Sequence, residues 1–96
     1  MDVRRYLVAY DITDQKRLRR IERIASAYGE RVQYSLFQCD LQLSKRKELE
    51  ALLRQNSDKK KDSVFIIDIT RLRTNDIIQI GDVRITFESN FASRVI

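Results

Sequence analysis

The feature that most constrains the fold of this chain is the order of its apolar segments, because strand-like and helix-like patterns alternate along the sequence. Residues 5–12 are rich in β-branched and aromatic residues and are apolar on both faces, which predicts a central strand. Residues 31–42 alternate, and they accommodate two short strands with a turn near Tyr34–Ser35. Residues 63–69 form another apolar run, which predicts a further buried strand.

Two helices are expected between these strands. Thr13 or Asp14 is expected to cap the first helix, and Gly29 is well placed to end it. Apolar residues recur there at the spacing of one helical face, at Leu18, Ile21, Ile24, Ala25 and Tyr28. Ser44 is expected to cap the second helix. That helix carries Leu49, Leu52 and Leu53 on one side.

The order strand, helix, strand, strand, helix, strand predicts a ferredoxin-like α+β domain of the βαββαβ type. Short β-like segments follow at 77–80, 83–87 and 94–96. Because no repeat, linker or domain boundary is visible, we expect residues 1–96 to form a single domain in which residues 77–96 are a C-terminal strand tail. This fold leaves one sheet face without helices, and an apolar open face is normally buried. We therefore expect a homodimer, in which the tail can pair with the partner protomer.

The absence of histidine narrows the chemistry that this chain can perform. It excludes His-rich zinc sites, His–Ser triads and histidine general bases, and the single cysteine, Cys39, excludes a multi-Cys zinc site. Catalysis would then use carboxylates, a hard metal ion, or Lys, Tyr and Arg side chains. A lone cysteine also suits a reducing compartment, and the short N-terminal apolar run resembles neither a signal peptide nor a membrane span. We expect a cytoplasmic protein.

Asp11 is the most informative acid, because it ends an apolar strand directly before a helix. A carboxylate there can bind Mg²⁺, and two copies of Asp11 in a dimer can share one ion that activates water for phosphodiester hydrolysis. The alternative is that Asp11 orders the turn before the helix, and spacing alone favours this structural role. Stabilisation of the helix dipole accounts for Asp14. Asp40 and Asp68 lie within strands and are interpreted as structural.

The net charge of +5 favours polyanionic partners, with nucleic acid first among them. The first helix carries a dense basic set that can grip phosphates, although a solvated helix face explains such sets more often: Lys16, Arg17, Arg19, Arg20 and Arg23. Lys59, Lys60 and Lys61 are interpreted as a mobile, solubilising loop. Some aromatic residues can stack on bases, although core packing is the commoner role of strand aromatics: Tyr6, Tyr10, Tyr34 and Phe37.

Three segments in combination carry a family resemblance: YLVAYDITDQKRLRRI, YGERVQYSLFQCDL and DSVFIIDI. They resemble the Cas-two family, the small CRISPR-associated proteins that work beside the Cas-one integrase. The resemblance covers residues 5–69, whereas the tail from Thr70 is similar only in its pattern of short strands. It implies a ferredoxin-like homodimer with C-terminal strands that cross to the partner.

The same resemblance implies a Mg²⁺ site, with Mn²⁺ as an alternative ion, at Asp11 and shared across the dimer. It places Tyr10, Arg20, Arg31 and Phe37 near the active cleft. Together with Arg17 and Arg19, these residues are the expected nucleic-acid contacts. Some members are described as metal-dependent nucleases on single-stranded RNA or double-stranded DNA. Others resemble non-catalytic adaptors that join Cas-one dimers, in a heterohexamer or heterotetramer, and hold DNA for insertion as a spacer.

Three hypotheses follow from the sequence. The first is a metal-dependent endonuclease with Asp11 as ligand and catalytic residue. The second is a DNA-binding adaptor in spacer acquisition, in which the arginines matter and Asp11 is structural. The third is a ribonuclease toxin of the VapD-like type, or a plain dimerisation module.

Overall fold

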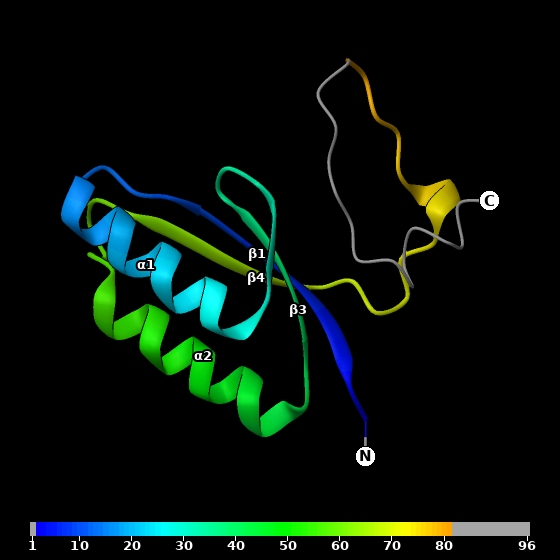
Figure 1. The fold of residues 1–96 in the computed structure, drawn as a ribbon, viewed down its shortest axis with the longest axis horizontal. Coiled ribbons are helices and arrows are strands. Elements are labelled where there is room, and N and C mark those ends of the chain that lie inside the picture. Colours follow the sequence, from blue (N-terminus) through cyan, green and yellow to red (C-terminus); the bar gives the residue numbers. More distant parts are fainter. Residues whose placement is uncertain (1, 82–96) are drawn as a thin grey trace.

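Four antiparallel strands and two helices form an α+β fold in the computed structural model, which describes residues 2–81 (Figure 1). The elements are β1 (Arg4–Asp11), α1 (Gln15–Tyr28), β2 (Glu30–Gln33), β3 (Leu36–Leu41), α2 (Leu43–Asn56), β4 (Ser63–Asp68) and a 3-10 turn (Thr74–Asp76). The sheet order is β2-β3-β1-β4, so β1 is central. Element order and sheet order together confirm the expected ferredoxin-like topology.

The residues of β1 alternate between two environments. Tyr6, Val8 and Tyr10 are buried under the helices, whereas the residues between them face the opposite side of the sheet. On that opposite side, Leu7 is in register with Ile67 of β4, and Ala9 is in register with Phe65. β1 is therefore apolar on both sides: one side packs against the helices, and the other forms part of the open face of the sheet.

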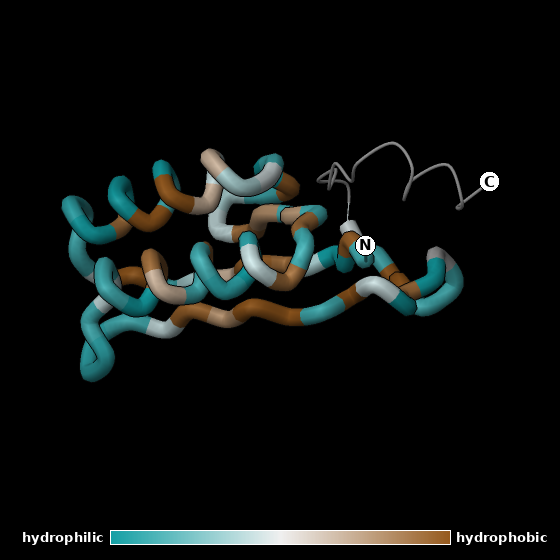
Figure 2. Tube along the Cα trace, turned by 90° about the horizontal axis from the view of Figure 1, so that it is seen from below, coloured by the Kyte–Doolittle hydropathy of each residue, from teal (hydrophilic) through white to brown (hydrophobic). Residues whose placement is uncertain are grey.

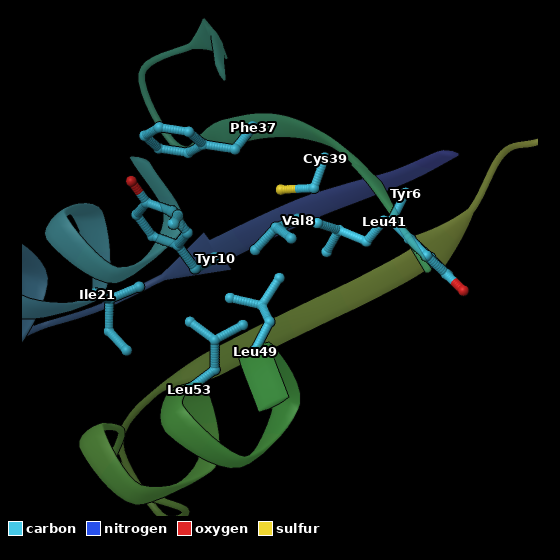
Figure 3. Close-up of a cluster of buried hydrophobic side chains, with 10 residues drawn as sticks. Tyr6, Val8, Tyr10, Ile21, Phe37, Cys39, Leu41, Leu49 and Leu53 are labelled. Carbon is cyan, nitrogen blue, oxygen red and sulfur yellow. The ribbon is translucent and has the colours of Figure 1, made fainter. Parts of the chain in front are cut away.

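The core lies between the sheet and one layer of two helices. Val8 is fully buried and lies between Cys39 of β3 and Leu49 of α2 (Figure 3). Ile21 of α1 and Leu53 of α2 belong to the same cluster. Cys39 is fully buried and unpaired, which confirms its interpretation as a small buried hydrophobic side chain, and this burial raises the pKa of its thiol to about 11.

Both ends of α1 follow the sequence pattern. Asp14 is the N-cap, and its carboxylate accepts a hydrogen bond from the backbone N–H of Arg17 at 3.0 Å. Gly29 ends the helix, and its N–H donates to the carbonyl of Ala25 at 3.0 Å. A Cβ at residue 29 would lie 2.2 Å from the carbonyl oxygen of Gln38, so close approach of β3 requires glycine there.

The start of α2 differs from the prediction. Its N-cap is Gln42, whose side chain makes no capping hydrogen bond, and the helix begins at Leu43. Ser44 therefore lies inside the first turn and does not cap the helix. The carbonyl of Gln42 instead accepts the first backbone bond, from the N–H of Arg46 at 3.0 Å.

The sheet face opposite the helices is apolar and open. Phe65 is 60% exposed and Ile67 is 47% exposed, although both belong to an apolar strand. Figure 2 shows the hydrophobic colour running along β4, next to helices whose colour alternates. Such a face is the surface expected to be covered by a partner.

The segment after β4 leads away from the helices (Figure 1). Residues 77–80 form no strand within the described part of the chain, and the other two expected tail segments, 83–87 and 94–96, lie outside it. Pairing of the tail with a second protomer remains a prediction. Among residues 2–81, no helix has the length and apolar character needed to cross a membrane.

Candidate functional site

Asp11 is exposed at the end of β1, in register with Ser63 at the start of β4. Because side chains alternate along a strand, its carboxylate shares the open sheet face with Ala9 and Phe65. Within residues 2–81 this carboxylate forms no hydrogen bond or ion pair. Of the two residues expected to cap the first helix, Thr13 and Asp14, it is Asp14 that does so.

Asp62 joins the two loops beside Asp11. Its side chain is completely covered, and its carboxylate receives Arg17 Nε at 2.7 Å and Arg17 Nη2 at 3.1 Å. It also accepts from the backbone N–H of Asp58 at 2.8 Å and from that of Thr13 at 3.3 Å. The Arg17 guanidinium is the main reason why the pKa of Asp62 lies well below its ordinary value. These bonds fasten the loop after β1 to the loop before β4.

From the sequence, Arg17 is expected to contact nucleic acid, but the structure shows that its guanidinium is not open to a phosphate. Its side chain is only 23% exposed, and its guanidinium is occupied by Asp62 and by Thr13 Oγ1 at 3.3 Å. The hydrogen bond to Asp62 raises the pKa of Arg17. Sequence reasoning missed Asp62, because it lies in a polar stretch 45 residues from Arg17 and no local pattern marks the pair.

The carboxylates at this end of the sheet differ in what they can bind. Asp62 is saturated by its donors, and Asp14 is engaged in capping α1, which lowers its pKa. Asp11 alone of the three offers a free, exposed carboxylate, a hard oxygen ligand that suits Mg²⁺ with several waters. In the part of the chain that the structure describes, no three acidic, histidine or cysteine side chains gather as a metal site. Asp11 can therefore offer one ligand to a metal ion, and a site shared between two copies stays a prediction.

The outer face of α1 carries open positive charge. Arg19, Arg20 and Arg23 are exposed, and so is Lys16. None of these four side chains has an ion-pair partner among residues 2–81. They are free to contact phosphates, and such contact by Arg19 and Arg20 stays a prediction.

Arg31 is held in place by several contacts. It donates to Glu22 at 2.8 Å and to the carbonyl of Tyr34 at 2.9 Å, and its guanidinium lies 5.1 Å from the centre of the Phe37 ring. The pair with Glu22 raises the pKa of Arg31. Its side chain remains 45% exposed, so Arg31 can still contact a ligand.

Tyr10 and Phe37 belong to the core, which is the commoner role of strand aromatics, and their burial does not fit the direct nucleic-acid contact that the resemblance implies. The exposed fraction is 6% for Tyr10 and 1% for Phe37, and their rings stack on each other at 6.3 Å (Figure 3). Burial raises the pKa of Tyr10 to about 12. A buried ring has no free face for a base, and Phe37 instead packs under the guanidinium of Arg31. Tyr34, at 83% exposure, is open to stacking.

Two further acids have the structural roles that the sequence predicts. Asp40 receives Arg5 Nε at 2.8 Å. Asp68 receives Arg4 Nε at 2.6 Å and Thr70 Oγ1 at 2.6 Å, and these donors lower its pKa to about 2. Both acids neutralise arginines near the start of β1.

Comparison with known proteins points to one family. The model of the family described as CRISPR associated protein Cas2 matches residues 4–77. The CRISPR-associated endoribonuclease Cas2 3 of Synechocystis sp. is 42% identical over 59 residues, which make up 62% of this chain and 64% of that protein. The CRISPR-associated endoribonuclease Cas2 1 of Rhodospirillum rubrum is 39% identical over 64 residues, 67% of this chain and 63% of that protein. The chain thus spans slightly less than two thirds of either relative.

A solved structure agrees with these matches. Streptococcus pyogenes Cas2, in a crystal structure at pH 6.5, superposes with a TM-score of 0.70 at 28% identity, covering 80% of this chain and 99% of that chain.

Proposed function

This chain belongs to the CRISPR associated protein Cas2 family, and from that premise we propose that it is a metal-dependent endonuclease that acts as a homodimer. The substrate is a phosphodiester of single-stranded RNA or double-stranded DNA, and the setting is spacer acquisition beside the Cas-one integrase. The observation that carries the proposal is the free carboxylate of Asp11 on the open sheet face. The two relatives described above are named endoribonucleases, which supports the proposed nuclease activity.

The open sheet face that carries Asp11 is also the argument for the proposed homodimer. Exposed Phe65 and Ile67 lie beside Leu7 and Ala9, and an apolar surface of this kind is stabilised by burial against a second copy. Asp11 shares that face at its end. Packing of two copies about a twofold axis can bring two Asp11 carboxylates to one ion.

The residues of the chain have distinct roles in this proposal. Asp11 provides the ligand, and a bound Mg²⁺ supplies a water of lowered pKa and offsets charge on the scissile phosphate. Arg19 and Arg20 hold flanking phosphates. Arg17 and Asp62 fix the loop that follows Asp11, so the carboxylate is presented on a constrained backbone.

A second candidate is a DNA-binding adaptor that joins Cas-one dimers without cleaving. The unpartnered Arg19, Arg20 and Arg23 favour it, because a basic helix face suffices for binding the DNA backbone. Within residues 2–81, no group of three or more acidic, histidine or cysteine side chains stands ready to hold a metal. The two candidates share the binding surface and differ in whether Asp11 is needed for chemistry.

The substitution Asp11→Asn separates the candidates, because it removes the charge of the ligand and keeps its shape. We expect Mg²⁺-dependent cleavage of RNA and duplex DNA by the purified protein to be lost, while thermal stability and nucleic-acid binding are retained. Asp40→Asn is the matched control, since Asp40 is also an exposed strand carboxylate but is paired with Arg5. Cleavage that survives in the Asp11 variant would refute the nuclease proposal. Binding without cleavage in the wild type would favour the adaptor.

A further inference from the structure

The lysine turn, Lys59–Lys61, is an ordered turn, although the sequence suggests a mobile loop. Asp58 Oδ1 accepts hydrogen bonds from the backbone N–H of Lys60 at 2.8 Å and of Lys61 at 3.2 Å. The carbonyl of Asp58 accepts from the N–H of Asp62 at 2.8 Å. An aspartate that bonds the backbone two and three residues on is the usual way to fix such a turn.

The lysine turn is also anchored to the candidate site. Asp58 donates its N–H to Asp62, and Asp62 holds Arg17 in the first turn of α1 and Thr13 in the loop after Asp11. Figure 1 shows the turn before β4 and the start of α1 at the same end of the molecule. The turn is therefore a fixed neighbour of the basic face of α1.

The positive charges of the lysine turn are available to a ligand. All three lysines are exposed, and none forms an ion pair within the described residues. The two nearby acids leave a net positive charge on the turn, because Asp62 is paired with Arg17 and the single charge of Asp58 offsets only one of the three lysines. Three adjacent unpaired ammonium groups on a fixed backbone attract a polyanion, and little backbone entropy is lost on binding.

We propose that the lysine turn binds the phosphodiester backbone of the nucleic acid and extends the basic face of α1 around the Asp11 end of the sheet. This inference rests on the proposed function, since it needs a nucleic-acid ligand. Lysine contacts to phosphate carry no sequence information, so the turn positions the strand rather than reads it.

The test is the salt dependence of binding in the double variant Lys60→Gln/Lys61→Gln. Lys59 stays intact, because it lines a cavity with Leu53 and Val64. The probes are a short DNA duplex and a single-stranded RNA of equal length. The slope of log affinity against log salt should become shallower by about 0.9 per lost contact for the duplex and about 0.7 for the single strand. Unchanged thermal midpoints verify that the variants are folded.

The charge-matched control is Lys45→Gln/Lys47→Gln, which removes two charges from exposed lysines of α2, where Lys45 lies 3.6 Å from Glu48. A shallower slope in the turn variant than in this control supports the proposal, and the probe that shows it identifies DNA, RNA or both as the ligand. Equal slopes in the two variants overturn the proposal while leaving the proposed function intact. Wild-type protein that binds neither probe overturns both, so the two failures are distinguishable.

Discussion

A single methyl group added at Gly29 would collide with a neighbouring strand. The added Cβ would lie 2.2 Å from the backbone oxygen of Gln38 and 2.5 Å from Cys39 Sγ. We expect Gly29→Ala to lower the free energy of unfolding by about 1–3 kcal/mol or more, as overpacking does. Urea unfolding measures this change.

The control for this prediction is Ala27→Ser, an exposed position in the last turn of the same helix. It should change stability by less than about 0.5 kcal/mol. If Gly29→Ala were as stable as this control, β3 would not approach the helix end as closely as the structure has it.

Individual residues differ in how far the sequence reveals them. Asp11 can be identified because it ends an apolar strand, and the burial of Cys39 follows from its place in an alternating strand. The Asp62–Arg17 pair cannot be found in this way, because its partners meet only when β4 lies beside β1. The burial of Tyr10 and Phe37 depends similarly on which face of the sheet the helices cover.

Among the elements, the bond between the loops after β1 and before β4 has a consequence for pH dependence. The pKa of Asp62 is lowered in the folded protein, so its contribution to stability is complete above the unfolded value of 3.8 and is lost as the pH falls through the folded pKa. We therefore expect the gap in thermal midpoint between wild type and Asp62→Asn to shrink as the pH falls from about 5 towards about 2.

Other carboxylates with lowered pKa values do not disturb this measurement. Glu48 and Asp68 are present in both proteins and share no partner with Asp62, so their contributions cancel in the difference. Asp14 lies 4.0 Å from Arg17 and shares that partner with Asp62, so both proteins carry Asp14→Asn in this comparison. A gap that stays constant over this range would mean that the ionised Asp62 does not stabilise the joined loops.

The pattern of elements can be predicted from the sequence more fully than their ends. Hydrophobic periodicity indicates all four strands and both helices, because each element buries one face. The start of α2 at Leu43 is missed, since no side chain caps it and Ser44 offers a misleading signal. Residues 77–80 have the composition of a strand but no neighbouring strand within the described chain, and composition alone does not supply one.

At the scale of the whole molecule, the open sheet face predicts how the chain associates. Phe65→Asp/Ile67→Asp places charges on the two most exposed apolar side chains of β4. We expect this variant to sediment as a monomer at concentrations at which the wild type is a dimer, because burying unpaired charges is costly. Cleavage that needs two copies of Asp11 should be lost as well.

The control places charge on the other layer of the molecule. Leu43→Asp changes an exposed apolar residue at the start of α2, away from the open face, and should leave the dimer intact. A wild-type protein that sediments as a monomer would remove the basis for a shared ion. A dimer that persists in the Phe65 and Ile67 variant would place the interface elsewhere.

The central place of β1 in the sheet also bears on the order in which the chain assembles. Both neighbours of β1, β3 and β4, follow it in sequence, and the bond from Arg17 to Asp62 closes a loop of 45 residues. Contacts across such separations form only after the chain entropy of the loop has been lost. The loop beside Asp11 therefore takes its final shape only when β4 docks, and during synthesis this loop stays unfixed until β4 has left the ribosome.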